Sequence, residues 1–274
     1  MGFNVVFTRF PGGKSKAFTL SYDDGMMSDA RLIDIMRKHG IKGTFNINSG
    51  TYRKEGAEGR RMTLAQAVET FQGDDVEVAT HGVYHDYPTR LPDDKLNFEF
   101  FMDRYQLEQQ FGRIVKGCAY AFGMVDDRVV ECLKKCGIKY ARTTVTTRGF
   151  GLPSNWLRFH PTCHHNDPQL MNLADNFLNM KVNRDAALFY VWGHTYEFDD
   201  NNNWNVIEEL AEKIGGHDDV WYCTNMEVCE YVEAFNRLEF TLDEKMVYNP
   251  TATTLWFKAG EDGDMYEIKP GETL

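Results

Sequence analysis

Four short groups of polar residues carry the side chains best suited to hydrolytic chemistry. They are Asp23-Asp24-Gly25, His81 to His85, Phe122-Gly123 and Gly193-His194. Adjacent carboxylates can diverge, so that one binds a metal ion and the other takes a proton from water. Asp-Asp-Gly is also common in turns, and an acidic turn is the alternative interpretation of the first group.

His81 and His85 are separated by four residues. On a helical turn, side chains at i and i+4 lie on one face and can chelate one ion. Imidazole suits zinc, and a carboxylate such as Asp24 completes a three-ligand site that keeps open positions. The alternative is that the two residues are unrelated loop histidines.

His194 follows a very apolar run that ends at Trp192, and Glu197 comes three residues later. A histidine at the end of a buried strand can act as an acid or base near neutral pH, or it can be a packed rim residue. A further group contains His160, His164 and His165. We interpret that group as structural or substrate-contacting rather than metal-binding.

The elements that position these groups alternate between strands and helices. The patterns predict strands at 17–22, 44–48, 76–80, 117–122, 139–145, 156–160, 186–192 and 220–224. They predict helices at about 29–39, 64–71, 94–111, 127–135, 169–180, 204–214 and 226–238. Repeated strand–helix units imply parallel strands with crossover helices. We therefore expect an α/β fold, a distorted (β/α)7–8 barrel, with a doubly wound open sheet as the alternative. The polar stretch 199–203 is predicted to be a solvated loop.

A barrel brings the carboxyl ends of its strands to one mouth, so the four polar groups can share one site. The tail differs, because two short apolar runs, 255–257 and 265–268, flank Gly260 to Gly263 and resemble a hairpin. We predict a barrel domain at residues 1–238 and a small β-rich C-terminal extension at 239–274.

Composition limits the possible partners. The chain has 274 residues, of which 42% are hydrophobic, and a net charge of -11. These values favour a folded domain and disfavour nucleic acid and anionic membranes as partners. The six cysteines form no CxxC pair, and no signal peptide or membrane span is visible in the sequence. We expect reduced thiols and a cytoplasmic protein, and nothing indicates the oligomeric state.

Together the four groups resemble the NodB-homology polysaccharide deacetylases, carbohydrate esterase family 4. Residues 20–25, Leu-Ser-Tyr-Asp-Asp-Gly, are similar to the first motif of that family, commonly TFDDG. His81-Gly-Val-Tyr-His85 resembles its HxxxH motif, Tyr120-Ala-Phe-Gly123 its third motif, and Val191-Trp-Gly-His194 its last. Motif order and spacing agree over about residues 15 to 230.

The resemblance implies a metal-dependent hydrolase that removes N- or O-linked acetyl groups from a carbohydrate or related small-molecule substrate. Asp24, His81 and His85 would hold one divalent ion, most simply zinc, with cobalt, nickel or manganese as alternatives. Asp23 would be the general base and His194 the general acid.

The resemblance also suggests residues that contact the substrate or its oxyanion, namely Phe122, Trp192 and Tyr84. The third motif of the family normally begins with an arginine that orients the base, and Ala119 stands there. We expect Arg142, Arg148 or Arg158 to supply the positive charge from another strand, and the pKa of Asp23 to be less depressed than in relatives.

Two other functions remain open at this point. One is a non-catalytic carbohydrate- or metal-binding protein on the same scaffold, because fold does not imply function. The other is an amidohydrolase that acts on non-sugar amides. Retention of both Asp23 and His194 favours catalysis, because holding a metal ion requires neither.

Overall fold

A parallel sheet forms the centre of the computed structural model, which describes residues 2–274. Its strands follow the order β6-β5-β4-β3-β2-β8-β7, and β9 pairs with β2 beside that path. The strands are β2 (Lys16–Asp23), β3 (Gly43–Ile47), β4 (Val76–Thr80), β5 (Gly117–Ala119), β6 (Tyr140–Arg142), β7 (Cys163–His164), β8 (Ala187–Gly193) and β9 (Val220–Tyr222). Every residue of β2 and β8 is buried, as expected for strands covered on both faces.

The two ends of this path meet across residues 159–165. Phe159 forms a parallel bridge with Arg142 of β6. Further along the same segment, the Thr162 N–H donates to the Tyr190 carbonyl at 2.8 Å, and the His165 N–H donates to that of Trp192 at 2.9 Å. The segment therefore contacts both β6 and β8 and joins the sheet edges, which confirms the predicted (β/α) barrel over the open sheet.

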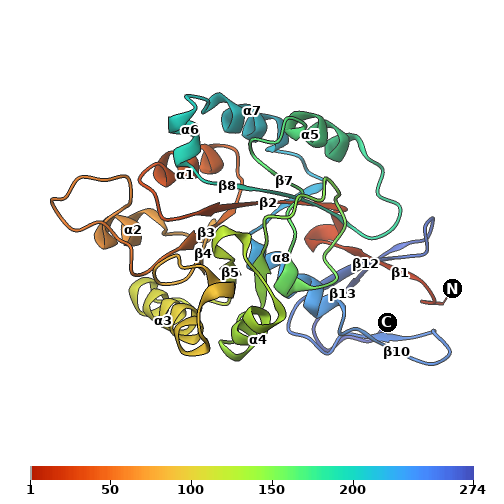
Figure 1. Ribbon diagram of the computed structural model, residues 1–274. Helices are drawn as coiled ribbons and strands as arrows, with labels where there is room; N and C mark the ends of the chain where they lie inside the picture. The colour runs from red at the N-terminus through yellow and green to blue at the C-terminus, as the bar shows by residue number, and fades with distance from the viewer. Residues whose placement is uncertain (1) are drawn as a thin grey trace.

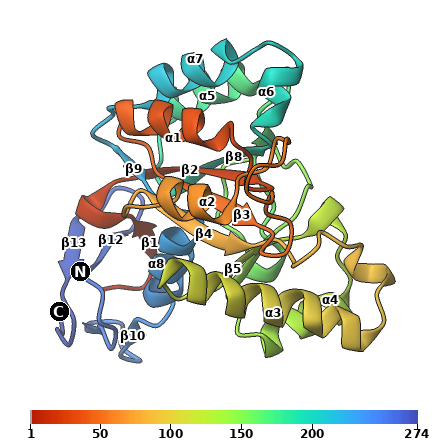
Figure 2. The same cartoon turned by 90° about the vertical axis from the view of Figure 1, so that its left-hand side faces the viewer.

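Helices cover the outside of the strands. They are α1 (Asp29–Lys38), α2 (Leu64–Thr70), α3 (Asp93–Phe111), α4 (Asp127–Lys135), α5 (Leu170–Asn179), α6 (Tyr196–Asp200), α7 (Asn205–Ile214) and α8 (Asn225–Phe235). In Figure 1 the helices α1, α5, α6 and α7 form a layer above the strands, while α3 and α4 lie below them. Figure 2 shows the same layers from the side. The main core lies between the strands and the upper helices, where Phe18, Phe45 and Phe189 are buried.

The predicted C-terminal hairpin forms from β12 (Leu255–Ala259) and β13 (Met265–Ile268). An unpredicted strand near the N-terminus, β1 (Val6–Arg9), pairs antiparallel with β12 and makes a three-stranded sheet. Phe257 is fully buried there, packed edge-on against Phe3. Two further short strands, β10 (Glu239–Phe240) and β11 (Val247–Tyr248), pair with each other. The two ends of the chain lie on the same side of the molecule (Figure 2), and the division at residue 238 stays a prediction.

Two predicted elements are wrong. Residues 156–160 are not a strand, because Trp156–Arg158 is a 3-10 turn that begins where the Asn155 side chain accepts the Leu157 N–H. The stretch 199–203 is not wholly a loop, because α6 runs to Asp200 and buries Phe198 at its centre. Within residues 2–274, no helix is long and apolar enough to cross a membrane, and the six cysteines are free and buried as expected.

Candidate catalytic and metal site

The carboxyl ends of four barrel strands supply the polar residues that the sequence singled out. Asp23 is the last residue of β2, and His81 follows β4 directly. Arg142 ends β6, and His194 follows the last residue of β8. The parallel order of the strands therefore brings together residues that are up to 171 positions apart in the chain.

Asp24, His81 and His85 gather as predicted, each offering one ligand atom within 4.8 Å of the others. The Nε2 atom of His85 lies 3.8 Å from Asp24 Oδ1, and the two imidazole centroids are 4.7 Å apart. The predicted helical turn is wrong, because residues 81–85 form an irregular loop. The residues meet instead through unusual backbone: φ is 85° at Asp24 and 59° at His85, values that non-glycine residues rarely adopt.

The His81 ring is oriented by the residue that stands where the family has its arginine. His81 Nδ1 lies 2.8 Å from the Ala119 carbonyl oxygen, which can only accept a hydrogen bond. The neutral ring therefore carries its proton on Nδ1 and leaves a lone pair on Nε2. That Nε2 atom is buried and has no hydrogen-bond partner. A metal ion would satisfy it, and a carbonyl-anchored imidazole is a common metal ligand.

Two acidic residues of α3 hold the loop that carries His81. The Asp103 carboxylate accepts the backbone N–H groups of Ser49 at 2.8 Å and His81 at 3.0 Å. Glu99 accepts the Tyr84 N–H at 3.0 Å. Sequence reasoning missed both residues. Both residues could have been recognised because they lie four residues apart on the apolar face of the helix. A carboxylate on that face is buried and needs a polar partner.

Asp23 is buried at the centre of the site and is surrounded by hydrogen-bond donors. Its Oδ2 atom forms an ion pair with the Arg142 guanidinium, and its Oδ1 atom accepts the Asn46 side-chain N–H at 2.8 Å. Burial alone would raise the pKa of Asp23, but Arg142, His81 and His194 lower it below its usual value. Asp23 is therefore an anion at neutral pH.

The comparison of the Asp23 pKa with that of relatives stays a prediction, and Arg142 supplies the positive charge that Ala119 lacks. Its guanidinium lies over the Trp192 ring, 4.2 Å from the centroid. Arg148 and Arg158, the other candidates, pair instead with Asp167 and Asp127.

His194 lies between two carboxylates. Its Nε2 atom is 3.7 Å from Asp23 Oδ2, and its Nδ1 atom is 3.4 Å from Glu197 Oε1. Burial alone would lower the pKa of His194, but the contacts with Glu197 and Asp23 raise it. Glu197, three residues after His194 in the chain, is therefore the acidic partner of that ring.

A buried carboxyl ties the His194 loop to the Asp23 loop. Asp29, the first residue of α1, accepts the Met26 N–H at 2.8 Å and the Thr195 hydroxyl at 2.6 Å. Ser28 precedes α1 without capping it through its side chain, because its hydroxyl pairs with that of Thr195 at 2.9 Å. Burial raises the pKa of Asp29 to about 8.

The predicted substrate-contacting aromatics occupy different positions. Phe122 is half exposed and lies edge-on to His85, with ring centroids 4.4 Å apart. It also stacks on Tyr87 at 4.2 Å. Tyr84 is exposed and stacks on Phe98, whereas Trp192 is buried beneath Arg142. Phe122 therefore lies beside the candidate metal ligands, whereas Trp192 contributes to the site by packing against the Arg142 guanidinium.

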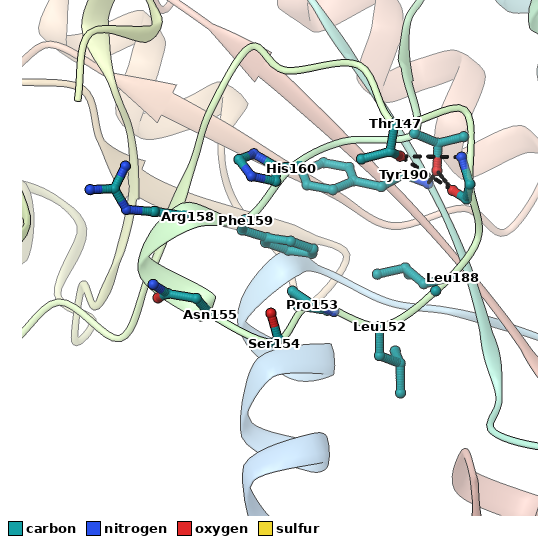
Figure 3. A pocket seen from close by; sticks show the side chains of 13 residues that line it. Thr147, Leu152, Pro153, Ser154, Asn155, Arg158, Phe159, His160, Leu188 and Tyr190 are labelled. Carbon is teal, nitrogen blue, oxygen red and sulfur yellow. Dashed lines mark hydrogen bonds between the residues drawn. The ribbon is translucent and has the colours of Figure 1, made fainter. Parts of the chain in front are cut away.

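A separate cavity of about 440 Å³ lies beside the barrel, lined by the loop 147–162 and by β8. Figure 3 shows His160, Phe159 and Tyr190 close together at its wall. The cavity contains none of Asp23, Asp24, His81, His85 and His194. We therefore assign the functional site to the cluster of polar residues at the strand ends and not to this cavity.

Part of the chain is similar in sequence to a known protein family. Residues 11–141 match the sequence model of the family described as polysaccharide deacetylase. This part of the chain is therefore similar to the polysaccharide deacetylases. The matched range includes Asp23, Asp24, His81 and His85 and ends one residue before Arg142. No curated protein sequence matches the chain.

Solved structures of polysaccharide deacetylases and related esterases share this fold. A Mycobacterium smegmatis protein assigned to the polysaccharide deacetylases is 16% identical, with a TM-score of 0.61 over 87% of this chain and 97% of that one. A family 4 carbohydrate esterase from Streptomyces lividans, solved with acetate, is 15% identical, with a TM-score of 0.51 over 77% and 92%. A Bacillus anthracis pseudoenzyme of the same family is also 15% identical, with a TM-score of 0.50 over 81% and 68%. At these identities the likeness concerns the fold.

The Asp23–Arg142 pair yields a stability prediction for this barrel. Arg142→Gln leaves a buried carboxylate without its guanidinium, which typically costs about 3–5 kcal/mol. Arg158→Gln removes an exposed pair and should cost less than about 1 kcal/mol. Urea unfolding of both variants and of the wild type gives the comparison.

The loss in Arg142→Gln should shrink on acidification. The pKa of Asp23 is lowered in the fold, so its stabilisation is present above the unfolded pKa and is lost as pH falls through the folded pKa. Equal stability losses in the two variants at neutral pH would contradict the buried-pair account.

Proposed function

We propose that the chain is a metal-dependent hydrolase that removes N- or O-linked acetyl groups from a carbohydrate or a related substrate. The observation that carries the proposal is the position of Asp23. Its Oδ2 atom lies 3.8 Å from the unpartnered Nε2 of His81 and 3.7 Å from Nε2 of His194. One carboxylate thus stands between the candidate metal ligands and a candidate proton donor.

The donor set fits one divalent ion. Asp24, His81 and His85 would hold it, and two imidazoles with a carboxylate favour zinc, with cobalt, nickel or manganese as alternatives. When bound, the ion would supply Lewis acidity toward water and toward an acetyl carbonyl. Arg61 helps to fix Asp24, because its guanidinium donates to the Asp24 carbonyl oxygen at 2.6 Å and lies 3.3 Å from Oδ1.

Asp23 is positioned to accept a proton from the attacking water. It is anionic, buried and held by Arg142, so its carboxylate cannot turn away from the reacting atoms. The water oxygen bonds to the carbonyl carbon as its proton passes to Asp23. The bond to the leaving nitrogen or oxygen then breaks, and acetate and a free amine or alcohol result.

His194 is positioned to donate a proton to the leaving atom. The contacts with Glu197 and Asp23 raise the pKa of His194, so the ring holds a second proton more readily near neutral pH. An amine anion is a very poor leaving group, and protonation of the nitrogen removes that barrier. An activated ester needs this proton far less.

Exposed aromatic side chains support a sugar-like substrate. Phe122 and Tyr87 stack on each other beside His85, and sugar rings pack well on such faces. Heterocyclic amides would pack there too, so an amidohydrolase acting on non-sugar amides is the alternative within the same chemistry.

The second class of function is binding without catalysis, and the fold is shared with a pseudoenzyme. The pairing of Asp23 with Arg142, and of His194 with Glu197, favours catalysis, because metal binding alone needs neither pair. Acetate release from acetylated sugars, peptidoglycan fragments and cyclic amides, with zinc or cobalt added, distinguishes the three functions. A cytoplasmic location also stays a proposal, supported by the six free thiols.

Metal content tests the ligand assignment. Elemental analysis of purified wild type should give about one divalent ion per chain, and His85→Ala should lose it, because the three-ligand set is broken. His160→Ala, a histidine outside the cluster, serves as the control and should keep the ion. Equal metal content in wild type and His85→Ala would remove His85 from the ligands.

Comparison of two substrates tests the general acid. His194→Ala should lower kcat for an acetylated amine by about 10²-fold or more and lower it far less for an activated aryl acetate, because only the amine requires the proton. Equal losses on both substrates would assign His194 a structural or binding role.

A further inference from the structure

Three imidazoles and one backbone N–H surround the Glu197 carboxylate at the start of α6. Oε2 lies 3.2 Å from Nε2 of His164 and 3.0 Å from Nε2 of His165. Oε1 lies 3.4 Å from Nδ1 of His194, whose backbone N–H donates to Oε2 at 3.4 Å. His164 and His165 come from β7 and the residue after it, so a different strand end reaches the partner of His194.

The His165 ring fills a narrow space that leaves no room for larger side chains at the neighbouring positions. It is buried and stacks between Tyr22 and Phe198, at centroid distances of 5.7 Å and 4.1 Å. A Cβ atom on Gly193 would lie 2.0 Å from His165 Nδ1, so glycine is required at that position. Neither ring nitrogen has an aligned hydrogen-bond partner, which leaves the carboxylate as its nearest charged group.

The same three side chains, His164, His165 and Glu197, have the composition of a metal site. The surroundings of His164 argue against that use. Its Nδ1 atom accepts the Asn166 backbone N–H at 3.1 Å, so the neutral ring carries its proton on Nε2. Nε2 therefore presents an N–H toward Glu197 rather than a lone pair for an ion.

We infer that His164 and His165 are positioning residues that hold the Glu197 carboxylate against His194. The inference rests on the proposed role of His194 as the proton donor. A carboxylate flanked at Oε2 by these two imidazoles keeps Oε1 beside Nδ1 of His194. That contact favours the Nδ1–H form of the neutral ring and leaves Nε2 directed toward Asp23, where a leaving group is protonated.

The charge states agree with this geometry. Burial alone would raise the pKa of Glu197, but the contacts with His164, His165 and His194 lower it, so the side chain is an anion. Burial lowers the pKa of His165 to about 4, so that ring is neutral at pH 7 and contacts Glu197 as a polar group rather than as a cation. Without the two imidazoles, Glu197 could turn toward solvent, because its side chain is 23% exposed.

The test reads the tautomer of His194 directly. Two-bond ¹H–¹⁵N correlation spectra of ¹⁵N-histidine-labelled protein show which ring nitrogen carries the proton. In the wild type above the His194 pKa, His194 should be the Nδ1–H tautomer. His164→Leu removes one polar contact to Glu197, and His165→Phe keeps the stack but removes the other, so both should give a mixture of tautomers. His164→Gln restores an N–H donor and should recover the wild-type spectrum.

Kinetics and metal content complete the design. In His164→Leu, kcat for an acetylated amine should fall by about 10-fold, part of the roughly 10²–10⁴-fold that a general acid supplies, with KM and aryl acetate hydrolysis little changed. His160→Gln, from the same segment but without contact to Glu197, is the matched control and should leave the tautomer unchanged.

An unchanged His194 tautomer in both His164→Leu and His165→Phe would overturn the inference. A second zinc ion per wild-type chain that His164→Leu loses would overturn it in favour of a metal site. If the wild type hydrolyses neither substrate but the tautomer still shifts in the variants, the proposed function fails while the positioning role stands.

Discussion

The ion pair between Asp23 and Arg142, buried at the mouth of the barrel, is the interaction on which the site depends. Two buried charges are costly unless they are paired with good geometry, and this pair joins the ends of β2 and β6 across the barrel. Closure of the sheet through residues 159–165 brings β6 to its place. The closed barrel thus places Arg142 beside Asp23, and Asp23 in turn lies between His81 and His194.

Around this pair, supporting contacts come from outside the recognised motifs. Ala119 orients His81 through its carbonyl oxygen, Asp103 holds the His81 backbone, and Glu197 faces His194. Each contact uses a backbone group or a carboxylate from a different element. Departures from the usual motif residues therefore leave the geometry of the site intact, because what is needed at each position is a charge or a donor, and another strand can supply it.

The sequence predicted the barrel and its site well where the patterns were long or chemically distinctive. Apolar runs such as 186–192 and helix patterns such as 127–135 match β8 and α4 closely. The strand-end groups Asp23-Asp24 and His81 to His85 converge because parallel strands leave no other arrangement. Short elements were missed: β7 has two residues and β1 pairs with a strand about 250 positions away, so neither has a local signal. Sequence alone offered Arg142 as one of three arginines, and only the register of β6 singles it out.

The central claim is that Asp23 is the base and not a metal ligand. Asp23→Asn keeps the side-chain shape but cannot accept a proton, and metal content and kcat can be measured on one preparation. The account predicts about one metal ion per chain, as in the wild type, with kcat for acetyl hydrolysis lowered by about 10²-fold or more. Wild-type activity would contradict the base role, and loss of the metal would place Asp23 among the ligands.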